Sequence, residues 1–302
     1  MAVSKTKTIR VVDFNNVEEH VKWLNFNRAS KHNYRTFPSK VIILNFSLSR
    51  FLKPYHIAPL ACLIHEYQTK GFKIKISKPN PRIKTYLESF GFDRFCKSVS
   101  ETGLEDPRDE KTFPLWLIKD EGKEFYTIKV KEYFENNHFY GHDLFVLGNS
   151  LGELLNNIFD HSQSKIPGYT FTQYNPRTNS IITCVCDFGI GIPNSVNRFL
   201  AKTGKQKLRN DKALAKAFEL SFSALTKPHN RGFGWNTVFG NLQILQGKLL
   251  IISNNTVFVL YPNGKINTQL FESNFPGTLI IITLNTSNLP LKEESSDEMD
   301  LF

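Results

Sequence analysis

The sequence predicts an α/β protein with two units, and three observations support this. Short apolar runs alternate with helix-like segments over residues 1–98, which is typical of a small α/β unit. A predicted amphipathic helix at 141–161 is followed by two β-rich runs with turn residues between them. Further strand-like runs linked by tight turns follow residue 247. We therefore expect the second unit to be a two-layer α/β sandwich, with helices on one face of a mostly antiparallel sheet.

Residues 1–111 are expected to form the first unit. The runs TIRVVDF, VIILNFS and FKIKIS predict strands, and VEEHVKWLNF, IAPLACLIHEYQTKG and PRIKTYLESFGF predict helices. The polar stretch SVSETGLEDPRDEK, from Ser98 to Lys111, has no periodicity and predicts a domain boundary. This order of strands and helices resembles STAS-like domains, the anti-sigma antagonist fold. That family usually has an Asp after the central strand and a phosphorylatable Ser at the next helix start, whereas Asn45 and Pro54-Tyr55-His56 stand here.

Residues 112–286 are expected to form the second unit, and 287–302 an acidic tail. The runs FPLWLIK and FYTIKV predict two short strands, and YTFTQYN, NPRTNS and IITCVC together predict a β-hairpin. Near the end, GKLLIIS, NTVFVLY, KINTQLF and PGTLIIITL predict strands, with Asn263-Gly264 as a hairpin turn. The tail is rich in Ser, Glu and Asp, a composition typical of disorder.

The helix LGELLNNIFDHS carries a polar stripe opposite its apolar face. Glu153, Asn157 and His161 lie four residues apart, so they follow one another along the helix. An Asn oxygen is a suitable ligand for Mg²⁺, and a Glu can orient or deprotonate a nucleophile. Such spacing is also common on solvated helix faces, so the stripe alone does not decide between the two interpretations.

Three glycine-containing segments follow this helix. The second run of the hairpin ends in Asp187-Phe-Gly189-Ile-Gly191, where glycine lets the backbone approach a ligand and the carboxylate can accept a hydrogen bond from an amine. The segment Arg231-Gly232-Phe-Gly234 opens an apolar helix, an arrangement suited to phosphate. Pro276-Gly277-Thr278 then leads into the last strand.

In this order and spacing, the four elements resemble the GHKL superfamily, the Bergerat-fold ATPases that include histidine kinases and anti-sigma-factor kinases. The resemblance covers residues 140–286. It implies an ATP site in which Asp187 binds the adenine amino group, supported by Thr278, and Asn157 holds Mg²⁺. It also implies that Glu153 is the general base. The glycine motifs would be formed by Gly189 and Gly191, and by Gly232 and Gly234, with Arg231 beside the phosphates.

The function that this resemblance implies is an ATP-dependent Ser/Thr protein kinase of the anti-sigma type in bacterial regulation. The alternative is an ATP-driven conformational switch that controls partner binding by the first unit without phosphotransfer. A sensor histidine kinase and a nucleotide-binding protein without catalysis rank lower. The box His65-Glu66-Tyr67-Gln68-Thr69 resembles a histidine-kinase phosphoacceptor, but it ends at Lys70-Gly71 rather than in a long hairpin, so we expect a surface-facing His65.

Composition and motif searches bear on other classes of function. The net charge is +10, yet the basic residues are scattered, so nucleic-acid binding has no motif to support it. A P-loop or Rossmann site is not supported, because neither glycine pattern is complete. No apolar run is long enough for a membrane span, which predicts a cytoplasmic protein. The four cysteines are expected to be buried thiols. A protein partner or substrate is expected, and a homodimer is left open.

Overall fold

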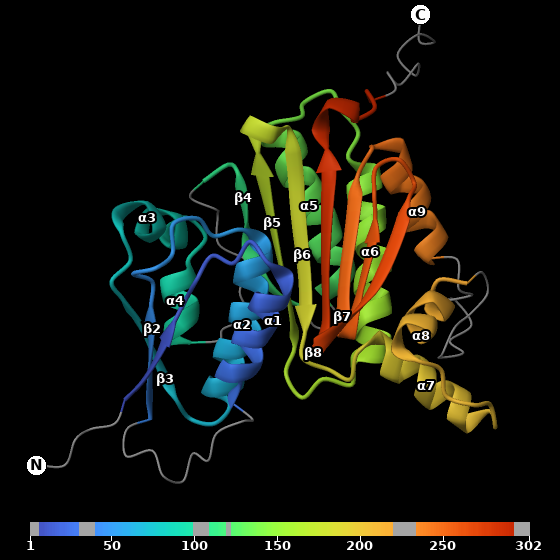
Figure 1. Cartoon of the computed structure of the whole chain (residues 1–302). Helices are drawn as coiled ribbons and strands as arrows, with labels where there is room; N and C mark the ends of the chain where they lie inside the picture. Colours follow the sequence, from blue (N-terminus) through green and yellow to red (C-terminus); the bar gives the residue numbers. More distant parts are fainter. Residues whose placement is uncertain (1–5, 30–39, 99–108, 119–121, 220–233, 293–302) are drawn as a thin grey trace, which may run out of the picture.

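The computed structural model describes residues 6–29, 40–98, 109–118, 122–219 and 234–292, without the side chains of 157–162. Within these ranges the protein is α/β, with a three-stranded parallel sheet and a five-stranded antiparallel sheet (Figure 1). The expectation of an α/β fold with a mostly antiparallel second sheet is therefore confirmed. None of the described helices has the length and apolarity that a membrane crossing requires.

The first sheet has the order β1-β2-β3, and all of its strands run parallel. Its strands are β1 (Lys7–Arg10), β2 (Val41–Asn45) and β3 (Lys73–Ser77). The helices of this unit are α1 (Val17–Asn27), α2 (Pro54–Gln68), α3 (Pro81–Ser89) and α4 (Phe92–Lys97). Local signals set several helix starts, since Asn16 caps α1, Asn80 caps α3, and a proline opens both α2 and α3.

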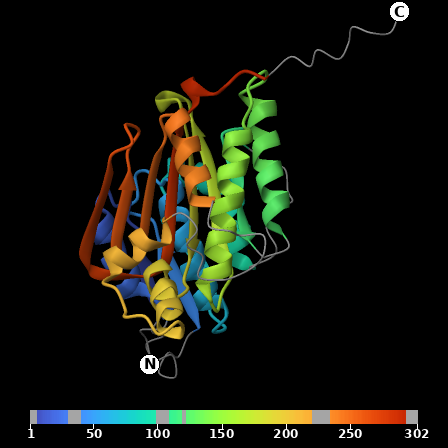
Figure 2. The same ribbon diagram turned by 90° about the vertical axis from the view of Figure 1, so that its right-hand side faces the viewer.

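The second sheet has the order β4-β5-β6-β8-β7. Its strands are β4 (Thr112–Ile118), β5 (Gly168–Asn175), β6 (Ser180–Asp187), β7 (Lys248–Leu260) and β8 (Ile266–Asn285). One face is covered by α5 (Lys123–Asn137), α6 (Phe145–Ser162) and α9 (Gly234–Ile244), and Figure 2 shows α5 and α6 in green along that side. The shorter helices α7 (Ile192–Lys202) and α8 (Asn210–Ala217) pack together at one end of the sheet (Figure 1).

Helix α2 lies between the two sheets (Figure 1). It packs against β3 of its own unit and against β5 and β6 of the second sheet, and it is buried along most of its length. One continuous apolar core therefore extends from the first unit to the outer face of the second sheet. Residues from both sides of the predicted boundary contribute to it, among them Leu63, Phe171 and Phe275.

The hairpins predicted around residue 177 and at Asn263-Gly264 are confirmed. Strands β5 and β6 pair antiparallel across a short 3₁₀ turn, and Tyr261 and Lys265 close the second hairpin with Gly264 at a φ of +77°. The runs predicted as four separate late strands form only the two long strands β7 and β8, with register shifts near Asn254. Part of the predicted acidic tail is ordered, because Leu289 packs in the helix-side core. Residues 293–302 lie outside the described residues.

Two local predictions are wrong. The run FYTIKV is helical, not a strand, because Tyr126, Val130 and Phe134 recur every four residues and all three are fully buried on one side of α5. His65 is only partly exposed and does not face the solvent freely. Its Nδ1 lies 2.8 Å from the Tyr169 hydroxyl of β5, and partial burial lowers its pKa. The second error arises because α2 is covered on both sides.

The shared core predicts that the two units unfold together. Replacing the fully buried Leu63 of α2 by Ala removes apolar contacts and leaves a cavity, so we expect a loss of about 2–5 kcal/mol. Denaturant unfolding followed by circular dichroism and by intrinsic fluorescence is expected to show one transition, shifted as a whole. Lys73→Ala, at an exposed position of β3, serves as the control. Two separate transitions, only one of which responds to Leu63→Ala, would contradict a shared core.

Candidate functional site

Three polar side chains lie in a row across the second sheet. Asp187 at the end of β6 is paired with Thr278 of β8, and Thr278 is paired with Ser253 of β7. Side chains alternate along a strand, so these three lie on the same face as Ile251 and Ile280, which belong to the core beneath the helices. The structure therefore brings the predicted residues Asp187 and Thr278 together, on the face that α6 covers.

The Asp187 carboxyl group is buried, with 1% of its surface exposed. Its Oδ1 accepts a hydrogen bond of 2.6 Å from the Gly189 N–H, whereas Oδ2 has no hydrogen-bond partner among the described residues. Burial raises the pKa of Asp187 to about 7, and backbone N–H groups of Gly189 and Thr278 oppose this shift. A buried acceptor without a donor is costly, so this position is suited to a ligand that supplies an N–H or O–H group.

The two neighbouring hydroxyl groups form a directed chain. Ser253 Oγ accepts the Ile192 N–H at 2.8 Å and donates to the Gly277 carbonyl at 3.1 Å. Because Ser253 has only one hydroxyl hydrogen, Thr278 is the donor in the 3.1 Å bond between the two hydroxyls. Thr278 Oγ1 thus keeps its acceptor capacity. Ser253 was not among the residues expected from the sequence, and a lone Ser in an apolar strand gives no local signal.

Two glycines allow the loop after β6 to take its path. Gly191 has a φ of +82°, and a Cβ there would lie 2.6 Å from Asn254 Oδ1. Gly277 has a φ of +118°, and a Cβ there would lie 2.2 Å from the Asp187 carbonyl oxygen. A side chain is disfavoured by backbone conformation at both positions, and at Gly277 it is also excluded by contact with backbone atoms, whereas at Gly191 it would displace the Asn254 side chain. The expected approach of a ligand to Gly189 and Gly191 stays a prediction; of the two glycines with positive φ here, Gly277 makes the closer contact.

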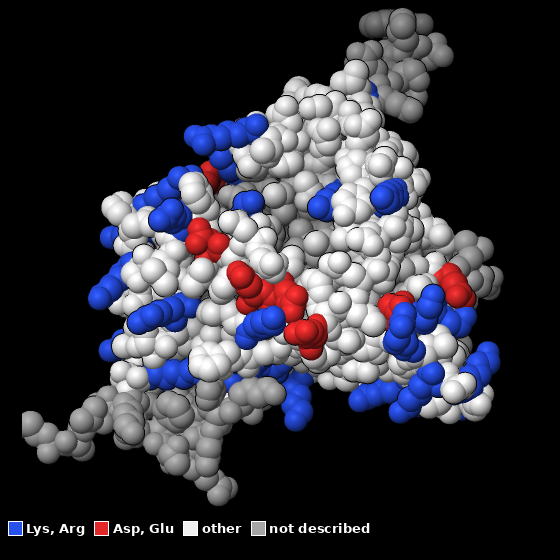
Figure 3. Space-filling model, viewed as in Figure 1, with Lys and Arg blue, Asp and Glu red and all other residues white. Residues whose placement is uncertain are grey.

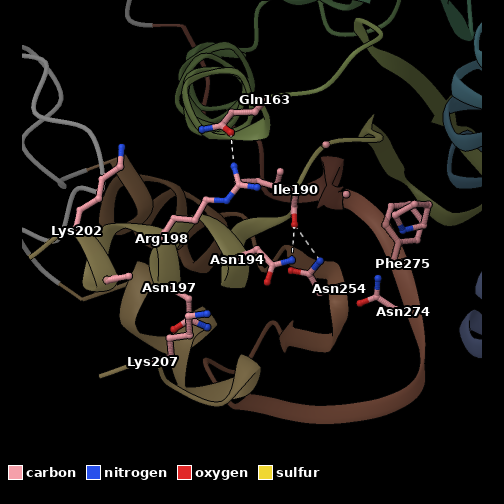
Figure 4. Close-up of a pocket in the computed structure, with 14 residues that line it drawn as sticks. Gln163, Ile190, Asn194, Asn197, Arg198, Lys202, Lys207, Asn254, Asn274 and Phe275 are labelled. Carbon is pink, nitrogen blue, oxygen red and sulfur yellow. Dashed lines mark hydrogen bonds between the residues drawn. The ribbon is translucent and has the colours of Figure 1, made fainter. Parts of the chain in front are cut away.

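Side-chain amides fix this loop from two directions. Asn194 of α7 and Asn254 of β7 both donate to the Ile190 carbonyl, at 2.9 and 3.0 Å (Figure 4). Asn254 lies at the register shift of β7 and has a φ of +51°. The Asn-Asn pair that interrupts the apolar run of β7 is the sequence signal for this bulge.

Glu153 lies on α6 and is half-buried, which raises the pKa of its carboxyl group. Its side chain forms no hydrogen bond or ion pair with any residue of the described part of the chain. Asn157 follows one turn later on the same helix, but its side chain lies outside the described residues, so the predicted metal ligand stays untested. At the end of α6, Arg198 of α7 donates to Gln163 and ties the two helices together (Figure 4).

An open cleft of about 790 Å³ adjoins the loop. Its wall includes Gly189 and Ile190 from the loop, Asn254 from β7 and the segment 274–277 from β8. The cations on its other side come from α7 and the segment that follows it: Arg198, Lys202 and Lys207. Amide groups and cations around an open cleft suit an anionic ligand or partner.

The first unit also touches the loop. Arg28, just after α1, forms a two-pronged ion pair with Glu66 of α2, with bonds of 2.7 and 3.0 Å. Its guanidinium lies 4.4 Å from the centre of the Phe188 ring, directly after Asp187. Phe188 in turn contacts Phe275 of β8 edge-on. This link was missed because Arg28 and Phe188 lie far apart in the sequence, and no local pattern relates them.

The other predicted site residues have different outcomes. Arg231 and Gly232 lie outside the described residues, and Gly234 is the first residue of α9.

Cys62, Cys96, Cys184 and Cys186 are free and buried, which confirms the expectation for the cysteines. Among the described residues, no group of three His, Cys, Asp or Glu side chains is arranged to hold a metal ion.

A scan against protein-family models finds no match for this chain, and a search of curated proteins finds none either.

The raised pKa of Asp187 predicts a pH-dependent stability. The folded state keeps the Asp187 proton up to about pH 7, whereas the unfolded chain releases it near pH 3.9. The contribution of this group is therefore fully present below about pH 4 and is lost as pH rises through 7. We expect the free energy of unfolding of Asp187→Asn, relative to the wild type, to rise with pH by up to about 1.4 kcal/mol per pH unit over this range. Parallel pH profiles of the two proteins would contradict the assignment.

The contact at Gly191 gives a prediction with a matched control. Gly191→Ala introduces a Cβ against Asn254, and we expect it to destabilise the fold by about 1–3 kcal/mol more than Gly204→Ala does. Gly204 also has a positive φ, of +71°, but no atom lies within 4 Å of its Cβ position. The difference between the variants in urea unfolding thus isolates the contact from the backbone strain. Equal losses would show that the Asn254 side chain moves away freely.

Proposed function

We propose that the chain binds ATP and Mg²⁺ in the manner of the GHKL superfamily, with a Bergerat-type second unit and a STAS-like first unit. The observation that carries the proposal is the buried Asp187. Its Oδ2 has no donor among the described residues, and its neighbours Thr278 and Ser253 present hydroxyl groups on the same face. An adenine amino group supplies the missing donor to Asp187. The Thr278 hydroxyl supports the base through a water molecule.

The remaining residues of the proposed site would serve the phosphates. Asn157 is the proposed Mg²⁺ ligand, and Arg231, Gly232 and Gly234 are the proposed phosphate contacts. The cations Arg198, Lys202 and Lys207 around the neighbouring cleft add to the attraction for an anion. Mg²⁺ would neutralise charge on the phosphates during phosphoryl transfer.

The proposed activity is an ATP-dependent Ser/Thr protein kinase. Glu153 accepts the proton of the substrate hydroxyl, the hydroxyl oxygen forms a bond to the γ-phosphorus, and the bond to the β,γ-bridging oxygen breaks to release ADP. The raised pKa of Glu153, together with the lack of an ion-pair partner among the described residues, suits a general base. The substrate would be a Ser or Thr of a partner protein.

The alternative is an ATP-driven switch without phosphotransfer to protein. The contact of Arg28 with Phe188 favours it, since this contact joins the first unit to the residue beside Asp187. A change in the loop on nucleotide binding would thereby reach Glu66 and helix α2. Slow hydrolysis would then reset the contact rather than modify a partner.

Protein incubated with Mg²⁺ and ATP labelled on the γ-phosphate distinguishes these proposals. With the wild type, we expect the label to appear on a protein of added cell lysate. With Glu153→Gln, we expect this labelling to be lost. The control Glu124→Gln makes the same change at an exposed position of α5, and we expect it to keep the labelling. Free phosphate without labelled protein would favour the switch. Equal turnover in Glu153→Gln and the wild type would remove Glu153 from the mechanism.

Nucleotide binding is measured separately with the same proteins by calorimetry. Asn157→Ala is expected to abolish Mg²⁺-dependent binding, whereas Asn156→Ala, one residue earlier, is expected to retain it. Glu153→Gln is expected to bind ATP like the wild type. Wild-type protein that binds neither ATP nor ADP would contradict the whole proposal.

A further inference from the structure

A second cavity lies on the opposite face of the antiparallel sheet from Asp187, and its volume is about 260 Å³. Its floor consists of Leu250 and Ile252 of β7 with Leu279 and Ile281 of β8, which alternate with the helix-side residues of the same strands. The segment 14–17 before and at the start of α1 forms a wall. The face of the molecule in Figure 3 is visibly hollowed beside the first unit.

His20 of α1 lines this cavity, and its ring forms no hydrogen bond with any part of the chain that the structure describes. It is 7% exposed, and its ring stacks on Phe14 at 5.7 Å and lies 5.5 Å from the ring of His56. Burial, with a smaller contribution from His56, lowers the pKa of His20 to about 3. The ring is therefore neutral, with one donor and one acceptor nitrogen left to engage a ligand.

The adjacent His56 differs from His20 in this respect. His56 Nδ1 accepts the Lys53 N–H at 3.0 Å, and Nε2 lies 2.9 Å from the Phe14 carbonyl oxygen. Both nitrogens of His56 are thus satisfied within the protein. The ring nitrogens of His20 are not among the polar atoms that the protein encloses fully, so they open on the cavity, where water or a ligand can complete their bonding.

The polar rim of the cavity favours an anion. Lys248 of β7 lines the cavity, with its ammonium 5.4 Å from the centre of the Tyr261 ring. The N-terminus of α1 lies at the wall, where the helix dipole is positive. The acids of the first turn are Glu18 and Glu19. Neither lines the cavity, and Glu18 is paired with Lys22 at 2.9 Å.

We propose that this cavity is a binding site for a small organic acid with an apolar body. The body would rest on Leu250, Ile252, Leu279 and Ile281, and the carboxylate would lie between Lys248 and the start of α1. The neutral His20 ring donates one hydrogen bond to the carboxylate. A volume slightly below the range of about 300–1,000 Å³ that is typical of small-molecule sites fits a ligand smaller than a nucleotide. The site is independent of the nucleotide proposal.

The test uses the full chain with phenylacetate as the probe and phenylacetamide as its neutral counterpart, followed by ligand-observed NMR and calorimetry. We expect saturable binding of the acid at millimolar concentration, at least tenfold weaker binding of the amide, and no change on saturation with ATP. Lys248→Met is expected to weaken the acid at least tenfold. Lys265→Met, an exposed lysine in the hairpin turn of the same strands, is expected to bind like the wild type.

Two further variants separate the floor from the polar groups. Ile281→Trp fills the cavity, and we expect it to abolish binding of the acid. His20→Phe keeps the aromatic packing but removes both nitrogens, and we expect it to reduce the affinity at least fivefold. Far-ultraviolet circular dichroism checks the fold of each variant. If Ile281→Trp or His20→Phe does not fold, the binding measured with Lys248→Met, a change at an exposed position, tests the proposal by itself. No saturable binding to the wild type, equal binding of acid and amide, or unchanged binding in Lys248→Met would each overturn the proposal.

Discussion

The fold depends on the antiparallel sheet being apolar on both faces. Residues such as Val185 and Ile280 point toward α5, α6 and α9, while Cys184 and Leu279 point the other way. A sheet of this kind must be covered on both sides, because burying apolar surface is the main favourable contribution to folding. Helix α2 supplies much of the second cover. The first unit is therefore part of the core of the protein rather than an attachment to it.

The covering of the sheet on both faces also explains how the residues of the candidate site are held in fixed relative positions. Asp187, Thr278 and Ser253 are held by strand pairing inside a sheet that is packed on both faces, so their relative positions follow from register. The loop after β6 is held by side chains from β7 and α7 and by Phe188 packing. A site built on regular elements is positioned more precisely than one built on loops alone.

Sequence reasoning succeeded where a structural cause is local. The hairpin turns at residues 176–178 and at Asn263-Gly264, and the end of β6 at Asp187, all follow from residue types within a few positions. The α5 segment was misassigned because β-branched and aromatic residues favour strands locally, whereas burial every four residues decided the helix. The exposure of His65 was misjudged since nothing in the local sequence shows that a second sheet lies beside α2.

Contacts between residues that are distant in the sequence could not be predicted from it. Arg28 over Phe188, and Asn254 against Gly191, join segments whose meeting depends on the whole topology. The resemblance implied that Asp187 and Thr278 share a site, and the structure pairs them, yet it gave no indication of Ser253 in β7, which bonds to the loop. Short motifs thus predict which residues lie together better than they predict which residues hold them in position.

Several buried polar atoms have no hydrogen-bond partner among the described residues, and Asp187 Oδ2 differs from the others. Gln68 Oε1 and Thr256 Oγ1 are also without a hydrogen-bond partner among the described residues, but both side chains are neutral, and Gln68 donates through its Nε2 to the Cys96 carbonyl oxygen. Asp187 is different because it is an acid whose ionisation is suppressed by burial. A carboxyl group kept in this state lowers the stability near neutral pH, and such a cost persists in proteins mainly where function requires it. A donor supplied by a ligand would favour the ionised carboxylate, so ligand binding and the charge of Asp187 are linked by the same free energy.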